Sequence, residues 1–562
     1  MQYLALASDY DGTLARDGVV DSATLAALER FRQSGRKLIL VTGRVLEELK
    51  SVFPQLDLFD RVVAENGAVL YSPGTRQKRT LAEPAPRAFF EALRRRGVEP
   101  LGAGDVIIST RRPAEVEMIK IIGELGLELQ VIFNKSSVMI LPSGVNKRTG
   151  LAAALFDLCL SEHNTVGIGD AENDHAFLRF CEASAAVANA IPSVKETAGV
   201  VTRGECGAGV SELIDRILAG DALGAPGRCR ILIGHEQDRE VFVPAWDTTL
   251  MVAGTSGGGK STFVTGLVEE RIGKKYQTCL IDPEGDYEAL PGAISIGDEN
   301  TAPSVEAVLQ ALEKPDSQVV VNMLGVAMAD RPVFFSVLLP KLQEMRSRIG
   351  RPHWIIVDEA HHMMPEDWAP ASSSDALKNL VLITIHPDHV SPAALQAVDA
   401  LIAVGDDAGE RVREFAESVG IEAPQVAEPD LPKHEAVAWL LKNGRPRRVR
   451  LIESELSRKR HKRKYARGDL GEDNSFYFRG AREKLNLRAQ NLMTFLQMAD
   501  GVDDETWNYH LKKHDYSKWF REKIKDEALA REAAQVESSQ RDARDGRRRI
   551  RAAIERRYTG PE

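Results

Sequence analysis

The chain has 562 residues, a formal net charge of −9 and a pI near 5.9, and 43% of its residues are hydrophobic. This length predicts three or four domains with packed cores, and the acidic balance excludes a generic nucleic-acid binder. Because the five cysteines form no CxxC pair and no apolar run is long enough to cross a bilayer, we expect a cytoplasmic protein that does not contact a membrane.

A pair of aspartates follows the first apolar segment. The run from Tyr3 to Ser8 predicts a short buried strand that delivers Asp9 and Asp11 onto the loop at its C-terminal edge. A carboxylate that attacks phosphorus needs a second acid to protonate the leaving oxygen and a hard cation to neutralise the anions. Asp9 and Asp11 supply the attacking carboxylate and the second acid, so the pair predicts a phosphate-transfer site.

The groups that would complete this site follow in order. The strand predicted at 37–41 ends in Thr42-Gly43-Arg44, whose hydroxyl and backbone amides suit phosphate oxygens, and Lys147 offers a cation. A later strand at 165–168 runs into a loop with Asp170 and Asp174, carboxylates of the kind that Mg²⁺ prefers. Between them, residues 84–142 combine a helix with extended segments, which predicts an inserted lid that excludes water.

The order DxDGT, TGR, NK, GDxxND resembles the haloacid dehalogenase (HAD) phosphatases over about residues 1–218, more narrowly the Cof- and sucrose-phosphatase-like subgroup with a C2-type cap. The resemblance implies a Rossmann-like α/β core with an α+β cap at about 84–142. It implies that Asp9 is the nucleophile and Asp11 the general acid and then base. It also implies that Thr42, Gly43 and Lys147 bind phosphate, and that Mg²⁺ is held by Asp9, Asp11, Asp170 and Asp174. The cap favours a small phosphorylated substrate over the end of a duplex.

A second phosphate-handling motif follows a small-residue segment at 219–228 that predicts a domain linker. A strand at 250–253, a glycine-rich loop and a helix from Thr262 give the strand, loop, helix order of a P-loop. Backbone amides would surround the β-phosphate, Lys260 would reach the β and γ oxygens, and Ser261 would ligate Mg²⁺. The residues predicted to bind ATP are Gly254, Thr255, Ser256, Gly257, Gly258, Gly259, Lys260, Ser261, Thr262, Asp358 and His386.

An acidic pair ends a further predicted strand at 354–357, so Asp358 would bind the metal and Glu359 would be the base for water. With the loop Asp282-Pro283-Glu284-Gly285-Asp286-Tyr287, these motifs resemble the HerA/FtsK class of ring-forming ATPases over about 229–452. The resemblance implies a RecA/HerA-like α/β domain, a homo-oligomer in the form of a hexameric ring, a sensor at Thr384 or His386, and an arginine supplied to the neighbouring subunit. The candidates for that arginine are Arg331, Arg411 and Arg413. The segment before Gly254 is short for a translocase.

The C-terminal part begins with a basic stretch. Residues 445–467 hold eleven Lys or Arg against two Glu, which suits nucleic-acid phosphates or a solvated linker at 453–470 equally well. Residues 471–562 predict a small α-helical domain with an aromatic core. His510 and His514 have the i, i+4 spacing of metal ligands on a helix, although a structural role is favoured because no third ligand is evident.

These observations lead to one main hypothesis and two alternatives. The main one is a bifunctional enzyme, a Mg²⁺-dependent HAD phosphatase fused to a HerA-like ATPase. The first alternative is a DNA-processing or phage-defence complex whose phosphatase acts on nucleotides or DNA ends. The second is an ATP-dependent assembly scaffold with little turnover.

Overall fold

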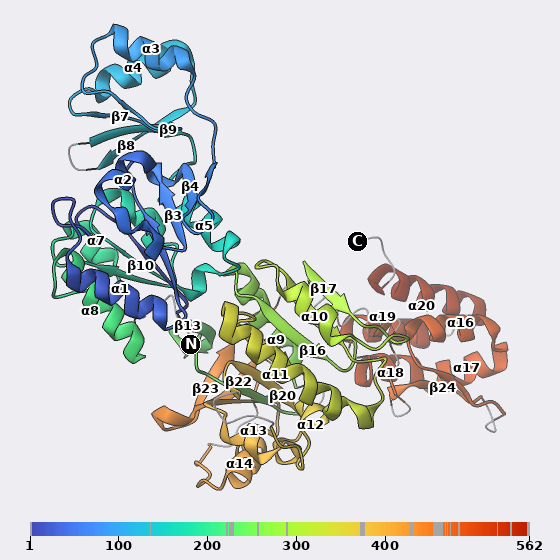
Figure 1. The fold of residues 1–562 in the computed structure, drawn as a ribbon. Coiled ribbons are helices and arrows are strands. Elements are labelled where there is room, and N and C mark those ends of the chain that lie inside the picture. The colour runs from blue at the N-terminus through green and yellow to red at the C-terminus, as the bar shows by residue number, and fades with distance from the viewer. Residues whose placement is uncertain are drawn as a thin grey trace. The chain divides into compact units, whose positions relative to one another are not determined.

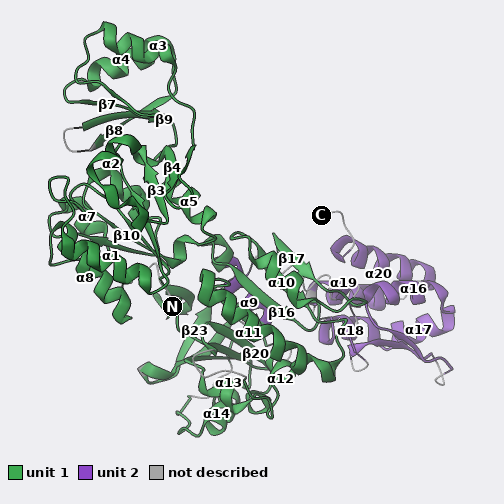
Figure 2. Ribbon diagram, viewed as in Figure 1, with its two compact units in different colours: residues 1–260, 270–452 green, residues 261–269, 453–562 purple. Residues whose placement is uncertain are grey.

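The computed structural model describes residues 3–134, 137–220, 223, 230–255, 258–287, 290, 292–370, 377–426, 431–432, 434–452, 454, 465–466, 468, 470–471, 474–480, 484–524, 526–539 and 542–558. The chain forms two compact units, residues 1–260 with 270–452 and residues 261–269 with 453–562 (Figure 2). Most of the two predicted linkers, 219–228 and 453–470, lies outside the described residues.

An eight-stranded sheet organises the N-terminal part of the first unit (Figure 1). Its order is β12-β11-β10-β1-β2-β3-β4-β5, parallel from β12 to β3 and antiparallel at β4 and β5. The strands are β1 Ala5–Ser8, β2 Lys37–Val41, β3 Arg61–Ala64, β4 Val69–Ser72, β5 Gln77–Thr80, β10 Thr165–Gly169, β11 Ala183–Ala186 and β12 Val200–Val201. The helices are α1 Ser22–Gln33, α2 Leu46–Val52, α5 Lys147–Asp157, α6 His175–Leu178, α7 Pro192–Thr197 and α8 Cys206–Ala219.

The central strands of this sheet are apolar and buried on both faces, as expected of a parallel sheet covered by helices. Strand β1 lies between β10 and β2, so the loops that follow these three strands meet at one edge. Those loops begin with Asp9, Asp170 and Thr42. The topology therefore gathers the predicted phosphatase residues at the carboxyl edge of the sheet, where ligands bind in open α/β folds.

A second, antiparallel sheet is inserted between β5 and α5. Its order is β6-β7-β9-β8, and Figure 1 shows two helices on one side of it. The elements are α3 Arg87–Arg95, β6 Gly102–Ala103, β7 Ile108–Arg111, α4 Glu115–Leu125, β8 Leu129–Asn134 and β9 Ser137–Pro142. They enclose their own hydrophobic core, which includes Phe89, Leu93, Met118, Ile121, Val138 and Ile140. The expected α/β core with an inserted α+β cap is confirmed.

The rest of the first unit contains an eleven-stranded sheet of order β14-β13-β23-β22-β21-β15-β20-β19-β16-β18-β17. The strands from β21 to β17 are parallel, and the other four extend the sheet in antiparallel fashion. The strands are β13 Arg230–Glu236, β14 Arg239–Pro244, β15 Leu250–Ala253, β16 Thr278–Asp282, β17 Ala293–Ile296, β18 Gln318–Asn322, β19 Trp354–Val357, β20 Leu380–Thr384, β21 Ala400–Val404, β22 Glu435–Leu440 and β23 Arg447–Leu451. The helices are α9 Lys260–Gly273, α10 Val305–Leu312, α11 Arg331–Ile349, α12 Ala360–Met363, α13 Pro392–Gln396 and α14 Ala408–Val419.

This second sheet confirms the expected P-loop α/β domain. The short segment before the P-loop, residues 230–244, forms a hairpin that belongs to the same sheet. Within the described part of the chain, no helix is both long enough and apolar enough to cross a membrane.

The C-terminal unit is mainly helical, as expected, and packs around aromatic side chains. Its helices are α16 Leu492–Gly501, α17 Asp504–Lys512, α18 Asp515–Glu522, α19 Glu527–Ser538 and α20 Ala543–Tyr558. The expectation that residues 476–478 are helical is wrong, because they form β24 Phe476–Phe478, paired with β25 Leu487–Ala489. Phe476 and Phe478 are buried and Tyr477 is not, so the segment has the period of two that characterises a strand.

His510 and His514 do not share a helix, which removes the predicted i, i+4 metal spacing. Helix α17 ends at Lys512, and His514 has a left-handed backbone with φ of 57°. The two rings of the pair have different partners: His510 lies 2.8 Å from the Asp515 carboxylate and His514 lies 3.2 Å from that of Glu537. The structural role favoured from the sequence agrees with these contacts.

Phe495 is the centre of the C-terminal core and yields the first prediction. Its ring is fully buried and lies 5.1–5.3 Å from the rings of Phe476, Phe478 and Trp519. Phe495→Ala is expected to lower the free energy of unfolding of this unit by about 3–5 kcal/mol through lost burial and a residual cavity. Urea unfolding followed by tryptophan fluorescence measures the change. Leu487→Ala, at a position that is 40% exposed, is the matched control and should cost far less.

Candidate active sites

Asp9 occupies the centre of the first site. It follows β1 directly, its backbone N–H donates to the carbonyl of Ile168 at 3.0 Å, and its side chain is almost fully buried. This hydrogen bond continues the pairing of β1 with β10, so it places Asp9 beside the acidic loop that follows β10. The aspartate is therefore fixed by the sheet rather than by a flexible loop.

Lys147 is the cation of this site, and its position is set by a helix cap. It is the first residue of α5, whose N-cap Asn146 forms a capping box with Thr149. The buried ammonium Nζ lies 2.5 Å from Oδ1 of Asp9 and 2.5 Å from Oδ1 of Asp174. The lysine thus connects the loop after β1 with the loop after β10.

The loop after β10 adds two further carboxylates. Asp174 accepts the backbone N–H groups of Asp170 and Ala171 at 2.8 and 2.9 Å, and Asp170 accepts the Thr13 hydroxyl at 3.0 Å. Ligand atoms of Asp9, Asp170 and Asp174 lie within 4.8 Å of one another, and all three residues are buried. Three carboxylates against one ammonium group leave two negative charges, so this donor set fits a divalent cation of the Mg²⁺ type.

Burial and the neighbouring charges both shift the pKa values of this cluster. Burial raises the pKa of Asp9 well above its usual range, Lys147 opposes this shift, and Asp174 and Asp170 add to it. Burial by itself lowers the pKa of Lys147, but the carboxylates of Asp174 and Asp9 outweigh it and the net shift is upward. An added cation would stabilise the ionised form of Asp9.

Asp11 is held by an arginine to which the sequence had assigned no role. The Arg44 guanidinium donates to both carboxylate oxygens of Asp11 at 2.7 Å and to Glu48 at 2.6 Å. Arg44 belongs to the same loop as Thr42, whose buried hydroxyl accepts the Arg44 backbone N–H at 3.1 Å. A cation directly after Thr42-Gly43 was the available sequence signal for this contact.

The cap contacts this phosphate loop. A Cβ placed on Gly43 would lie 3.4 Å from Cε of Met139, a residue of cap strand β9. The connection between core and cap is fixed by Glu65, whose buried carboxylate accepts the backbone N–H groups of Asp105, Val106 and Ile107 at 2.8–2.9 Å. No sequence signal pointed to Glu65 or Met139, because their partners are distant in the chain.

The second site begins at the loop after β15. Gly254 and Gly259 have positive φ of 155° and 103°, and a Cβ on Gly254 would lie 2.2 Å from the carbonyl oxygen of Val404. Lys260 starts α9, and its ammonium group donates to the carbonyl oxygens of Gly254 and Thr255 at 2.6 and 3.1 Å. Burial lowers the pKa of Lys260, with Glu359 and Asp358 opposing this effect.

The other predicted members of this loop fall into two groups. Gly258 is described within the loop, and Ser261 and Thr262 lie in the first turn of α9. Ser256 and Gly257 lie outside the described residues.

The acidic pair Asp358 and Glu359 follows β19, one strand away from the P-loop strand. Asp358 is buried and accepts the backbone N–H of Glu359 at 3.0 Å, while Glu359 has a left-handed φ of 43°. A non-glycine residue in this region is strained, and such strain concentrates at functional sites. Strand β20 lies between β15 and β19 and ends in the buried Thr384.

His361 connects Glu359 with Thr384. Its Nδ1 lies 3.1 Å from the Thr384 hydroxyl oxygen and 3.5 Å from Oε2 of Glu359. The Thr384 hydroxyl donates to the carbonyl of His386, so it accepts from Nδ1–H of His361. Burial, together with nearby histidines, lowers the pKa of His361 to about 4, so the ring is neutral near pH 7. The sequence had not singled out His361.

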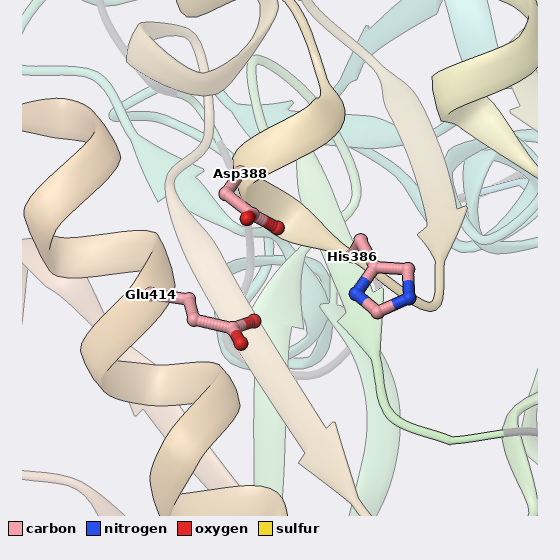
Figure 3. A group of neighbouring side chains, drawn as sticks. All are labelled: His386, Asp388 and Glu414. Atoms are coloured by element: carbon pink, nitrogen blue, oxygen red, sulfur yellow. The ribbon is translucent and has the colours of Figure 1, made fainter.

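His386 was predicted to bind ATP, and the structure places it next to Arg411. Figure 3 shows its side chain with those of Asp388 and Glu414, whose ligand atoms lie within 4.8 Å of one another. The Arg411 guanidinium donates to Glu414 at 2.6 Å and lies 3.3 Å from Nδ1 of His386. A fixed cation therefore already neutralises this group, which disfavours a metal there. Thr384, the alternative sensor, is the one that contacts His361.

Three arginines are candidates for the residue that reaches the ATP site of a neighbouring subunit, and two of them form hydrogen bonds or ion pairs within their own domain. Arg331 donates to the carbonyls of Val326 and Pro283, and Arg411 pairs with Asp407 and Glu414. Arg413 is exposed.

Comparisons with known proteins place both halves of the first unit among known families. Residues 6–105 and 111–214 match the family model of haloacid dehalogenase-like hydrolases, and residues 248–323 match that of the central domain of helicase HerA. Phosphoglycolate phosphatase 2 of Saccharolobus solfataricus is 29% identical over 229 residues, 39% of this chain and 94% of that protein. The phosphoglycolate phosphatase of Metallosphaera sedula is 31% identical over 225 residues, 38% of this chain and 98% of that protein. A haloacid dehalogenase-like hydrolase structure from Bacteroides thetaiotaomicron covers 38% of this chain and 100% of its own, with 18% identity and a TM-score of 0.34.

The chain therefore belongs to the haloacid dehalogenase-like hydrolases through its N-terminal part. Downstream of the hydrolase, residues 248–323 are similar to the HerA central domain, so the chain joins a hydrolase to a HerA-like segment, as both motif sets had indicated.

The Glu65 contact yields the second prediction. Glu65→Gln removes a charge that three N–H groups share and turns one amide donor toward them, so we expect a loss of about 1.5–3 kcal/mol in unfolding free energy. Chemical denaturation measures this loss, and limited proteolysis of the 105–107 segment should become faster. The control is Glu29→Gln on α1, a half-buried carboxylate that accepts the side-chain amide of Gln33 at 3.3 Å and contacts no cap residue in the described hydrogen bonds. Equal stability of the two variants would contradict the anchoring role of Glu65.

Proposed function

We propose that this chain is a bifunctional hydrolase, a Mg²⁺-dependent phosphomonoester phosphatase joined to an ATP-hydrolysing module. The observation that carries the phosphatase assignment is the buried cluster in which Lys147 lies 2.5 Å from both Asp9 and Asp174. It combines a nucleophile, a fixed cation and a divalent-cation donor set at one edge of the sheet.

The chemistry proceeds in two displacements. A carboxylate oxygen of Asp9 attacks phosphorus, the ester P–O bond breaks, and Asp11 gives a proton to the leaving oxygen. Asp11 then takes a proton from water, which attacks the aspartyl phosphate and releases inorganic phosphate. Thr42, Gly43 and Lys147 hold the phosphate oxygens, and Arg44 positions Asp11 through its two hydrogen bonds.

The metal is proposed from the donor set. Asp9, Asp170 and Asp174 would hold Mg²⁺, with Asp11 as the fourth predicted ligand. When bound, Mg²⁺ neutralises the anions and so permits a carboxylate to approach a phosphate.

The substrate is proposed to be a small phosphorylated metabolite, with 2-phosphoglycolate as the first candidate. Two similar proteins bear the name phosphoglycolate phosphatase, and Met139 of the cap lies against Gly43 of the phosphate loop. A cap this close to the phosphate loop disfavours the end of a nucleic-acid duplex. A panel of 2-phosphoglycolate, sugar phosphates, nucleotides and 3′-phosphorylated DNA, each with Mg²⁺ or with a chelator, tests the assignment. Turnover that favours DNA ends would support the DNA-processing alternative instead.

The ATPase half is proposed from Lys260, Asp358 and Glu359. ATP phosphates would replace the carbonyl oxygens that now accept from Lys260, Ser261 and Asp358 would hold Mg²⁺, and Glu359 would activate water. His361 is proposed to position Glu359 relative to Thr384. The resemblance to ring-forming ATPases supports a homo-oligomer, and Arg413 is the exposed candidate for a contact across subunits.

Nucleic-acid binding receives less support from the described part of the basic stretch. Arg447 and Arg448 on β23 form ion pairs with Glu236 and Glu435. Residues 455–464 lie outside the described residues.

Removal of the nucleophile is the third prediction. Asp9→Asn should lower phosphatase turnover by about 10³-fold or more, because an amide cannot form the covalent intermediate, and should leave ATP hydrolysis intact. Phosphate release from the preferred substrate and from ATP, measured on one preparation, checks both statements. Loss of both activities in folded protein would refute two separate chemical centres.

Removal of the predicted base of the ATPase gives the fourth prediction. Glu359→Gln should slow ATP hydrolysis by about 10²–10⁴-fold while it preserves nucleotide binding and phosphatase turnover. A coupled ADP assay and binding of a fluorescent nucleotide separate these effects. The control is Glu366→Gln, an exposed carboxylate in the same region. Unchanged ATP turnover in Glu359→Gln would exclude Glu359 as the base.

A further inference from the structure

A buried polar cluster joins the phosphatase core to the ATPase domain within the first unit. On the phosphatase side it consists of residues 159–164, which precede β10, and Glu182, which precedes β11. On the ATPase side it consists of Trp246, residues 274–277, which precede β16, and residues 350–353, which precede β19. All of these segments lie near the amino ends of their strands, opposite the two candidate active sites.

The Glu182 carboxylate is the hub of this cluster. It belongs to the phosphatase core and is buried. One of its oxygens accepts the Tyr276 hydroxyl at 2.7 Å and the Trp246 indole N–H at 3.4 Å, and the other lies 2.6 Å from Nδ1 of His163. A buried carboxylate is costly unless it is paired and hydrogen-bonded, and here the Tyr276 and Trp246 donors come from the other domain.

His163 connects this carboxylate to the ATPase backbone. Its Nε2 lies 2.8 Å from the carbonyl oxygen of Lys274, and its ring stacks on Tyr276 with centroids 3.7 Å apart. Both ring nitrogens therefore face acceptors. One acceptor belongs to the phosphatase core and the other to the ATPase domain, so the ring lies between the two domains.

A second set of contacts lies beside the first. His353 of the ATPase accepts the backbone N–H of Gln277 at Nδ1, so its proton is on Nε2, 3.0 Å from the hydroxyl of Ser161 in the phosphatase. Burial and then the charges of His163 and Arg351 lower the pKa of His353, which agrees with this neutral form.

Contacts of Arg351 and Gly350 with the phosphatase core complete the cluster. The fully buried Arg351 donates to the carbonyl of Cys159 at 2.9 Å, across the two domains. A Cβ on Gly350, where φ is 71°, would lie 2.3–2.4 Å from the side-chain amide of Asn164. The Asn164 side chain thus packs directly on the Gly350 backbone, at a positive φ and in a space that both favour glycine.

We propose that this cluster is a permanent joint that makes the phosphatase core and the ATPase domain one cooperative folding unit. Separation of the domains removes partners from buried groups on both sides: Glu182 loses the donors of Tyr276 and Trp246, and Arg351 loses the carbonyl of Cys159. The proposal rests on neither catalytic activity. It assigns to Glu182, His163 and Tyr276 the role of coupling residues rather than catalytic ones.

Hydrogen exchange on the full chain tests this proposal without any ligand. Leu213, fully buried in α8 of the phosphatase core, is replaced by Ala to destabilise that core alone. If the two domains unfold together, the slowest amides of β10 in the phosphatase and of β16 and β19 in the ATPase all exchange faster by one common factor, about 30-fold or more. Faster exchange in β10 with unchanged exchange in β16 and β19 would overturn the proposal.

A second substitution locates the coupling in the cluster. His163→Ala, added to Leu213→Ala, should return β16 and β19 to slow exchange while β10 remains fast. Tyr276→Phe removes a single hydroxyl, keeps the stacked ring and should weaken the coupling in part. It replaces His163→Ala in the experiment if the alanine variant does not fold. Asp215→Ala, which breaks the exposed ion pair between Arg30 and Asp215 in the phosphatase, is the control and should leave the coupling unchanged. A common factor that persists in both cluster variants would assign the coupling elsewhere.

Discussion

The buried ammonium group of Lys147 is the interaction on which the phosphatase site depends. A charge in the protein interior is tolerated only where opposite charges and hydrogen bonds surround it, so α5 must start within reach of two loops at once. That requirement explains the close packing at the start of this helix. A Cβ on Gly67 would lie 2.0 Å from the carbonyl of Asn146, and one on Gly150 would lie 2.7 Å from Cα of Gly67. The glycines permit the approach that the ion pairs require.

The two candidate sites present positive charge in the same way. In each, a lysine is the first residue of a helix that follows an irregular loop: Lys147 in α5 and Lys260 in α9. The helix start contributes unpaired N–H groups and a positive dipole end, and the lysine adds a full charge. The difference lies in the partners of the lysine. Lys147 contacts carboxylates that belong to the chemistry, whereas Lys260 contacts carbonyl oxygens of its own loop, which a nucleotide would displace.

Local motifs made much of this architecture predictable, because both sites lie on loops that directly follow apolar strands. The strands at 37–41 and 250–253 were predicted with their observed bounds, and Asp9 and Asp170 meet because their strands pair. Contacts between distant segments were not predictable: the contact of Glu65 with the cap has no local pattern, and the place of Arg44 after Thr42-Gly43 does not by itself identify Asp11 as its partner. The strand at 476–478 was missed since three residues are too few to establish a period of two.

The joint between the domains lies at the amino ends of the strands, opposite the two candidate active sites, and this placement has a mechanistic consequence. β10, β16 and β19 each begin at the joint and end in an acidic loop of a candidate active site, at Asp170, Asp282 and Asp358 respectively. If the two domains unfold as one unit, any ligand that binds one site stabilises the folded state of both, by a free energy that rises with the logarithm of the ligand concentration relative to its dissociation constant. Nucleotide bound at the P-loop would then protect the phosphatase core without contact to it, which gives a physical reason for joining the two domains in one chain.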